Sequence, residues 1–386
     1  MTMIHILRAY NYFYFSLLSI FISFLPIYYT SQGLTAAQIG VIIGAGALTG
    51  IISQPVWGII SDRFKTVKKV ILLILLLSIC IGTVLLHATA FQPILLLTVL
   101  LYFFFLPTDP LTESLNYRIA QQKGISFGSI RMFGAIGYAT TSLFVGYTAD
   151  AYGIESLAWL FVIFGLATLL SCLILPDVPV TRSTVSFRSL GRFFAYPRTV
   201  WFFALVFITA LPHRMNDHFL GVAIQSLGGS AGLVGQAWFW NAASEVLFFA
   251  ISFWFLKKMK EVTLISLAAA CYTVRYALCS LATSPEQIVA LQLMQGVTFV
   301  VFYTAAIHYL YKVVPEEWKS TGQTILAILF FGVSGMVGSL LGGMVLEQYG
   351  ASSLFLLMAG LSFASLVFSL LLRKNAAEET LPGRTP

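Results

Sequence analysis

Seven charged side chains stand inside long apolar stretches of this sequence, where their types and spacing suit them to bind a polar solute or to carry a proton. They are Asp109, Glu113, Arg131, Arg214, Asp217, Glu245 and Arg275. One charge near the centre of a bilayer costs about 2.5 to 3.5 kcal/mol on insertion scales. Residues of this kind therefore pair with one another or line water, and each of them marks a candidate site.

Glu113 and Arg131 are predicted to form an ion pair at similar depths in the membrane. Glu113 lies five residues before Arg118 in one apolar stretch, and Arg131 lies eight residues after Lys123 in the next. A guanidinium group and a carboxylate can each bind two neighbouring hydroxyl groups of a solute. We expect a solute to break into this pair; the alternative is a buried ion pair with only a structural role.

Further candidate groups share the helical faces of this pair. Asp109 and Asn116 fall on the face of Glu113, and Tyr138 falls two turns beyond Arg131 on the face of that residue. An aromatic ring at that position suits the flat face of a sugar or a base. The predicted substrate-binding residues are therefore Asp109, Glu113, Asn116, Arg131 and Tyr138.

Charged residues in the second half of the chain are candidates for proton coupling. Glu245 is the preferred carrier, because it lies about twelve residues from Lys257 and so near the middle of its stretch. Asp217 is the alternative, and Arg275 would keep either acid ionised if it paired with it. Three further residues cluster around Asp217, where a satisfied polar role is a simpler interpretation than a proton relay. They are His213, Arg214 and His218.

The elements that must position these residues are membrane-spanning helices. Of the 386 residues, 58% are hydrophobic and 10% are charged, and the mean hydropathy is +0.88, far from the composition of soluble domains. Twelve apolar stretches are each long enough, at about 20 residues, to cross a bilayer. They lie at 7–29, 36–60, 69–87, 91–117, 127–149, 155–175, 199–224, 232–256, 262–282, 286–311, 320–345 and 351–372. The sequence therefore predicts an all-α integral membrane protein with twelve transmembrane helices.

The cations outside these stretches predict the orientation of the chain. Of the 22 Lys and Arg residues, all except Arg131, Arg214 and Arg275 lie near the chain ends or in alternate connections, beginning after the second stretch. The intervening connections carry acids such as Asp150 and Glu347 but no cation. Cytoplasmic loops carry the excess of Lys and Arg, so we expect both termini in the cytoplasm. The net charge of +7 then reflects orientation and contact with anionic lipid, not binding to nucleic acid.

The chain also repeats itself, which predicts two pseudo-symmetric halves of six helices. VGYTADAYGIESL at 145–157 matches GGMVLEQYGASSL at 342–354, with Gly146 aligned to Gly343 and Asp150 to Glu347 at an offset of 197. A parallel repeat of this kind is typical of transporters whose site lies between the halves. The predicted division is an N-terminal half at 1–175, a cytoplasmic linker at 176–198, and a C-terminal half with a short tail at 199–386.

The motif GIISDRFKTVKK, which begins at Gly58, resembles the connection between helices 2 and 3 of the major facilitator superfamily. Gly58, Asp62 and Arg63 fit the pattern of that family, and Lys65 stands where the family has a second glycine. The resemblance implies that these three residues act as a latch for a gate and do not contact solute. It also implies the major facilitator fold.

A narrower resemblance covers nearly the whole chain. FLPIYYTSQGLTAAQIG, QPVWGIISD and FGSIRMFGAIGY resemble segments of the lactose permease group, which includes oligosaccharide, nucleoside and phenylpropionate proton symporters. The resemblance implies that Glu113 and Arg131 bind sugar hydroxyls and that Tyr138 takes the place of a stacking tryptophan. In the second half, Asp217, Glu245 and Arg275 match charged positions of the permease. Its coupling residues on helices 10 and 11 are replaced here by Gln295, Thr298 and Gly332, so coupling must use other acids or be absent.

Together these features predict a secondary active transporter, not an enzyme, with no catalytic residues. We expect it to move a small polar solute (a sugar, a nucleoside or an aromatic acid) across the cytoplasmic membrane by alternating access, as a monomer in proton symport. The proton gradient would be the energy source, without a cofactor or a metal. The alternatives are efflux of drugs or metabolites by the same fold and, from another class, a membrane sensor that transports nothing.

Overall fold

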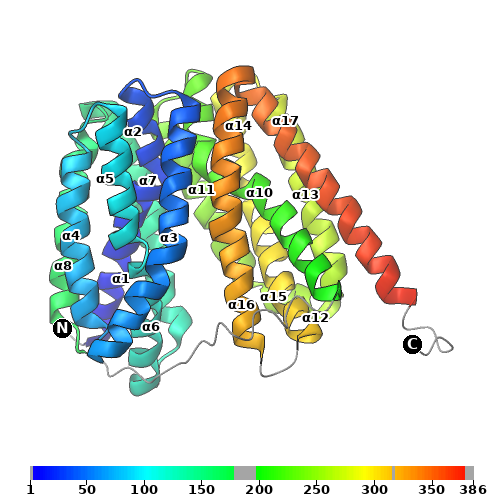
Figure 1. Cartoon of the computed structure of the whole chain (residues 1–386), viewed down its shortest axis with the longest axis horizontal. Coiled ribbons are helices and arrows are strands. Elements are labelled where there is room, and N and C mark those ends of the chain that lie inside the picture. Colours follow the sequence, from blue (N-terminus) through cyan, green and yellow to red (C-terminus); the bar gives the residue numbers. More distant parts are fainter. Residues whose placement is uncertain (1–2, 178–196, 315–317, 379–386) are drawn as a thin grey trace.

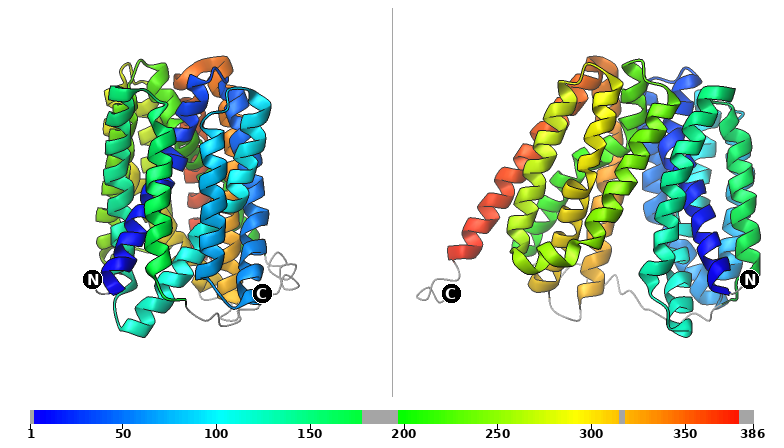
Figure 2. Two further views of the ribbon diagram at one scale, coloured as in Figure 1. Left: turned by 90° about the vertical axis from the view of Figure 1, so that its left-hand side faces the viewer. Right: turned by 180° about the vertical axis from the view of Figure 1, so that it is seen from behind.

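The chain folds into two groups of helices that stand side by side, α1 to α8 and α10 to α17 (Figure 1). The computed structural model describes residues 3–177, 197–314 and 318–378, and all regular elements in those ranges are helical. Most of the predicted linker, from 178 to 196, lies outside the described residues, as do its cations Arg182, Arg188 and Arg192 and the tail from 379 with Arg384. Both ends of the described chain lie on the same side of the molecule (Figures 1 and 2).

The first group contains six membrane-crossing segments, of which the first and the fourth are interrupted. The first consists of α1 (Met3–Ser19), the π-helical turn η1 (Ile20–Phe24) and α2 (Leu25–Ser31). The others are α3 (Ala36–Phe64), α4 (Lys68–Leu85), α5 (Phe91–Phe105) with α6 (Thr108–Lys123), α7 (Phe127–Tyr152) and α8 (Ser156–Ile174). Pro107 stands at the break between α5 and α6, because proline cannot donate the backbone hydrogen bond that a continuous helix needs.

The second group repeats this plan with more irregular turns. It begins with α10 (Pro197–Ser226), α11 (Ala231–Ala250) with α12 (Ser252–Lys258), and α13 (Glu261–Ser280). The next segment consists of α14 (Pro285–Leu291), the 3₁₀ turn η3 (Gln292–Met294), the π-helical turn η4 (Gly296–Val300) and α15 (Val301–Val313). The last two consist of α16 (Lys319–Ala327), the π-helical turn η6 (Ile328–Val333) and α17 (Ser334–Glu378). Gly350 lies inside α17 with φ 79° and ψ 177°, so α17 is two helices that meet at this residue.

The described residues thus confirm the predicted all-α membrane fold. Eight helical segments are long and apolar enough to cross a membrane, or nine if α11 and α12, bent by 54°, count as one. One of the eight spans 321–373 and therefore contains the two crossings that meet at Gly350. The helices α7 and α10 are not among them, and these two carry Arg131, Arg214 and Asp217. With them, the segments match the twelve predicted spans.

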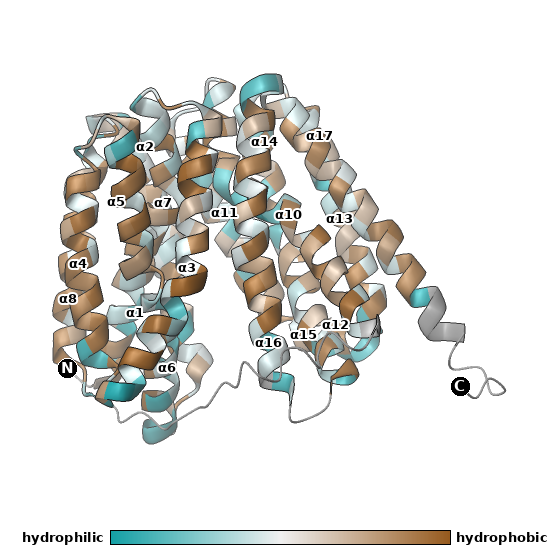
Figure 3. Ribbon diagram, viewed as in Figure 1, coloured by the Kyte–Doolittle hydropathy of each residue, from teal (hydrophilic) through white to brown (hydrophobic). Residues whose placement is uncertain are grey.

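The two faces of the molecule differ in charge. The basic side is formed by connections and helix ends that carry Arg63, Lys65, Lys68, Lys69, Arg118, Lys123, Lys257, Lys258, Lys260, Lys312, Lys319 and Arg373. The acidic side is formed by the connections around Asp150, Glu155, Glu286 and Glu347. Hydrophobic residues dominate the helices between the two sides, and hydrophilic residues gather at helix ends and connections (Figure 3).

The two groups of helices contact each other near the acidic side and diverge toward the basic side (Figure 1). At the contact, α3 packs against α17 and α7 packs against α11. Four glycines let the backbones approach: Gly40 faces α17, Gly343 faces α3, Gly146 faces α11 and Gly235 faces α7. A Cβ atom on any of them would collide with a carbonyl oxygen of the facing helix. Gly146 and Gly343, aligned in the sequence repeat, therefore occupy equivalent contacts.

Candidate functional site

Glu113 and Arg131 form the predicted ion pair between α6 and α7. Glu113 Oε1 lies 2.7 Å from Arg131 Nε, and the guanidinium carbon lies 3.9 Å from the centre of the Phe15 ring on α1. Gly134, one turn after Arg131, lets Phe15 approach, because a Cβ there would collide with that ring. The Arg131 side chain stays 41% exposed and that of Glu113 29% exposed. The pair is therefore held on one side and open on another.

Asp109 and Asn116 lie on either side of Glu113 along α6 but have different surroundings. Asp109 is half-buried and its Oδ1 accepts a hydrogen bond of 3.5 Å from the Tyr14 hydroxyl group. Asn116 is fully buried, and its amide pairs reciprocally with that of Asn11 on α1 at 2.8 and 2.7 Å. The structure therefore places Asp109 beside the open pair, whereas Asn116 joins α6 to α1. Asn116 has no face open to a solute, so the structure gives no support to its predicted role in solute binding.

Tyr138 lies where the two groups of helices meet. Its hydroxyl group is 3.0 Å from the Ser23 hydroxyl group on the first segment, and its ring contacts the edge of Trp238 on α11 at a centroid distance of 6.0 Å. Trp238, Asn241 and Glu245 follow at helical spacing along α11. Trp238 Nε1 and Asn241 Oδ1 are buried and find no hydrogen-bond partner among the described residues. Both side chains are buried in this state, and buried polar atoms need partners, so water or a solute can bind this row only when the surrounding helices move.

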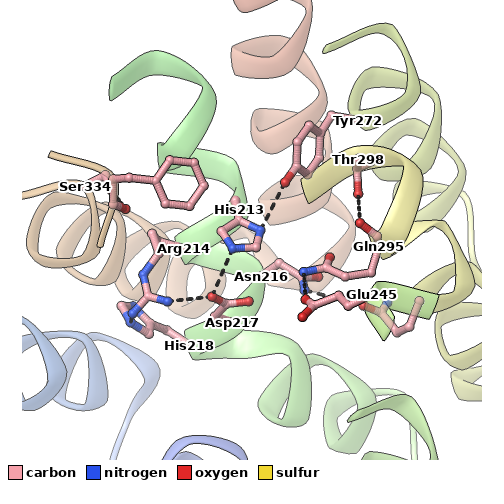
Figure 4. Close-up of polar contacts among 12 residues, drawn as sticks. His213, Arg214, Asn216, Asp217, His218, Glu245, Tyr272, Gln295, Thr298 and Ser334 are labelled. Atoms are coloured by element: carbon pink, nitrogen blue, oxygen red, sulfur yellow. Dashed lines mark hydrogen bonds and ion pairs between the residues drawn. The ribbon is translucent and has the colours of Figure 1, made fainter. Parts of the chain in front are cut away.

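Asp217 belongs to a compact network on α10 (Figure 4). Its Oδ2 lies 2.6 Å from Arg214 Nη1 and 3.5 Å from His213 Nε2. The His213 ring stacks on Phe299 with a centroid distance of 4.7 Å, and its Nδ1 lies 3.2 Å from the Tyr272 hydroxyl group. Asp217 is thus neutralised within its own helix by Arg214, and His213 is held on both nitrogens.

Arg275 is fully buried on α13, and its acceptors are neutral. Its Nη1 donates to Gln295 Oε1 at 2.5 Å and to Thr298 Oγ1 at 3.2 Å, and its Nη2 donates to Gln292 Oε1. The turns η3 and η4 interrupt the helix where these three acceptors stand. Among the described residues Arg275 forms no direct ion pair, so the pairing with Asp217 or Glu245 that the sequence left open is not present.

Gln295 links Arg275 to Glu245. Its amide oxygen accepts from Arg275, and its Nε2 donates to Glu245 Oε1 at 3.0 Å. Gln295 and Thr298, which cannot carry protons, thus hold the buried guanidinium group and, through Gln295, orient the acid. Gly332 has a different place: a Cβ on it would meet the Ile51 side chain of α3, in the other group of helices.

The three predicted latch residues lie at the basic end of α3. The Asp62 and Arg63 side chains are exposed, and a Cβ on Gly58 would have no neighbour within 4 Å. No hydrogen bond or ion pair of the Asp62 carboxylate is found among the described residues. The turn after α3 is held instead by Asp177, which accepts from Thr66 Oγ1 at 2.5 Å and from Lys68 N at 3.4 Å.

A family model described as "MFS_1 like family" matches residues 4–357. The chain belongs to this family. It is similar to the uncharacterized transporter YwbF of Bacillus subtilis (strain 168), with 27% identity over 92% of this chain and 89% of the relative. It is also similar to the maltose permease of Geobacillus stearothermophilus, with 26% identity over 89% and 87%. A crystal structure of the nucleoside transporter NupG has a TM-score of 0.85 at 18% identity and covers 97% of this chain and 100% of that one. The protein is therefore a multi-pass transporter with the major facilitator fold, not an enzyme.

Some residues near the candidate solute and proton sites were not singled out in the sequence. Trp238 and Asn241 precede Glu245 by seven and four residues, so the helical spacing from a candidate acid could have identified them. Asn11 lies on a helix remote in sequence and gives no such signal. No group of three or more His, Cys, Asp or Glu residues that could hold a metal ion occurs in the part of the chain that the structure describes.

Proposed function

We propose that this MFS_1-like transporter takes up a small polar solute (a sugar, a nucleoside or an aromatic acid) by alternating access in symport with protons. One observation carries the proposal. The half-buried Glu113–Arg131 pair stands on one group of helices, the row Trp238, Asn241 and Glu245 stands on the other, and the Tyr138–Trp238 contact joins the two groups. A site built from both halves is sensitive to their rocking, as transport by this fold requires.

The chemistry of the pair suits a solute with hydroxyl or carboxylate groups. The Glu113 bond uses Arg131 Nε, so the terminal N–H groups of the guanidinium can donate to solute oxygens. The free lone pairs of Glu113 can accept from solute hydroxyl groups. The rings of Tyr138 and Trp238 suit a flat apolar face. Trp238 Nε1 and Asn241 Oδ1, which have no hydrogen-bond partner among the described residues, add one donor and one acceptor.

Glu245 is the best proton carrier among the four membrane acids. Glu113 lies 2.7 Å from Arg131 and Asp217 lies 2.6 Å from Arg214, so neutralising either acid would leave a cation unpaired. Glu245 instead bonds to the neutral amide of Gln295. The Gln295 N–H group can donate to Glu245 in both protonation states, to an oxygen of the carboxylate or to the carbonyl oxygen of the protonated acid. Asp109, which accepts from the Tyr14 hydroxyl group, lies one turn from Glu113 and is better placed to tune solute binding.

The distribution of cations supports a cytoplasmic basic side, with both termini in the cytoplasm of a plasma-membrane protein. On that assignment, the present structure is an inward-facing state, because the two groups of helices are in contact near the acidic side and diverge toward the basic side (Figure 1). The names of the maltose permease and the nucleoside transporter NupG are in keeping with solutes of the proposed classes.

A transport screen in liposomes tests the proposal. Purified protein would be assayed for saturable uptake of radiolabelled sugars, nucleosides, aromatic acids and hydrophobic cationic drugs, beside Arg131→Ala and, as a matched loss of one cation, Lys123→Ala. We expect one class to be transported by the parent and by Lys123→Ala but not by Arg131→Ala. Equal uptake by Arg131→Ala would contradict the site, and transport confined to hydrophobic cationic drugs would contradict the solute class.

A further inference from the structure

Two carboxylates on the acidic side each bind a helix that belongs to the opposite group. Asp150, at the end of α7, accepts through Oδ2 from Ser230 Oγ at 2.7 Å and from Gly232 N at 3.0 Å. Glu347, on α17, accepts through Oε2 from Ala37 N at 2.8 Å. Asp150 thus reaches from the first group to α11, and Glu347 reaches from the second group to α3.

The two contacts are equivalent in detail. Ala37 is the second residue of α3, and Gly232 is the second residue of α11. The residues that cap the two helices, Thr35 and Ser230, each accept from the backbone N–H of the third residue at 3.3 Å. The free N–H groups of a first helical turn need acceptors, and the helix dipole favours an anion there. In both helices the hydroxyl cap serves the third N–H, and a carboxylate from the other group serves the second.

The equivalence follows the internal repeat of the sequence. Asp150 and Glu347 align at an offset of 197, and they lie four residues after the aligned glycines Gly146 and Gly343. Those glycines let the helix backbones touch. The glycine contacts are close backbone packing without an N–H hydrogen bond across the interface among the described residues, whereas the hydrogen bond of a carboxylate to a backbone N–H forms only when the two helices meet in register.

We propose that Asp150 and Glu347 are positioning residues for the transport cycle, a pair of equivalent latches that hold the acidic side closed and must both release before it opens. Parting the two groups on this side would return each carboxylate and each helix start to water. The exchange favours the closed state modestly, as suits a device that must open in every cycle. This inference rests on the transporter fold alone and requires neither the solute nor the proton coupling proposed above.

The rate at which a buried thiol is alkylated measures the open fraction directly. Ser339 is fully buried where α17 meets α3, so Ser339→Cys becomes reactive only when the two groups part. The reporter would be placed in full-length protein whose own cysteines, Cys80, Cys172, Cys271 and Cys279, are replaced by alanine. Reaction with a polar maleimide then gives a rate proportional to the open population, even when that population is small.

Alanine at either latch should speed this alkylation by about three- to tenfold, as expected for one charged hydrogen bond at an exposed helix start. The two effects should multiply in the double variant, because the latches share no partner. Asp150→Asn and Glu347→Gln keep an acceptor oxygen and should give smaller effects. The matched control is Glu286→Ala, which removes an acid from the same side in the first turn of α14 and should change nothing.

A second reporter separates opening from loss of structure. Spin labels at the exposed residues Thr89 and Thr283, in connections of opposite groups, should show an added longer distance in the double variant while its elution from a sizing column is unchanged. The proposal is contradicted if the double alanine variant is alkylated at the rate of the parent. It is also contradicted if Glu286→Ala speeds alkylation as much as the double alanine variant does.

Discussion

Arg131 lies 2.7 Å from Glu113 through Nε while 41% of its side chain remains exposed. Arginine–carboxylate pairs are frequently bidentate, with two parallel N–H donors on the carboxylate. Here the contact uses Nε, and no hydrogen bond of the terminal N–H groups is found in the part of the chain that the structure describes, so the ion pair can hold its geometry and still bind a ligand.

The first prediction separates the shape of Arg131 from its charge. In Arg131→Lys the ammonium group can still neutralise Glu113, but it offers no planar fork to a solute. We expect solute affinity to fall by about 10- to 100-fold while yield and thermal stability stay near those of the parent. Equilibrium binding of the solute found in the screen is the measurement. Affinity within twofold of the parent would mean that Arg131 serves the fold alone.

The second prediction concerns Asn241, whose Oδ1 is buried without a partner among the described residues. Asn241→Leu removes this acceptor from the proposed site while keeping an α-helical residue of similar size. The expected loss in affinity is about tenfold, the value of one hydrogen bond to a solute hydroxyl group. Trp240→Phe, at an exposed position one residue away, is the control and should bind normally. Equal affinities in the two variants would exclude Asn241 from the site.

A third prediction addresses the link through Gln295. In Gln295→Leu the buried Arg275 loses an acceptor and Glu245 loses its donor, so the free energy of unfolding should fall by about 1 to 3 kcal/mol. Gln295→Glu restores an acceptor for Arg275 but cannot donate to an ionised Glu245. We expect it to recover stability without recovering uphill transport. Thermal unfolding in detergent and transport in liposomes measure the two effects, and joint recovery would contradict the proposed role of the amide.

The fourth prediction gives a direction to the latch on the basic side. The Asp62 carboxylate has no hydrogen-bond or ion-pair partner in this state among the described residues, and we expect it to gain one when the basic side closes. Asp62→Asn should therefore weaken that other state and slow alkylation of Ser339→Cys, the opposite of the effect expected at Asp150 and Glu347. Faster alkylation would show that Asp62 stabilises the present state.

The sequence was sufficient to predict the fold and one ion pair because both depend on local rules. A charge inside an apolar stretch is exceptional, and depth can be counted from the cations at the membrane surface, so Glu113 and Arg131 could be matched without a structure. The span carrying Arg131 was recognised although α7 is too polar to pass as a membrane helix by composition alone. The length of its apolar, Gly-rich stretch predicted that span, and the alternation of cations along the chain agreed with it.

The contact partners of several residues could not be predicted, because they depend on which helices face each other in the folded chain. The face shared by Glu113 and Asn116 was identified, but Asn116 is turned to Asn11 on α1, because one helical face is wide enough to serve two neighbours. Gln295 was dismissed because an amide does not titrate, yet its position between Arg275 and Glu245 depends on turns η3 and η4, which leave no clear trace in the sequence. Asp150 and Glu347 were aligned by the repeat, but their partners lie on helices of the opposite group.

The most direct test of the central claim is the accumulation of solute in liposomes under an imposed pH gradient. The parent should concentrate solute above the external level, while Glu245→Gln should exchange labelled for unlabelled solute at a comparable rate yet accumulate none, because its neutral side chain imitates the protonated acid. Accumulation by Glu245→Gln equal to that of the parent would remove Glu245 as the carrier. If the parent itself only equilibrates solute under the gradient, proton symport is contradicted.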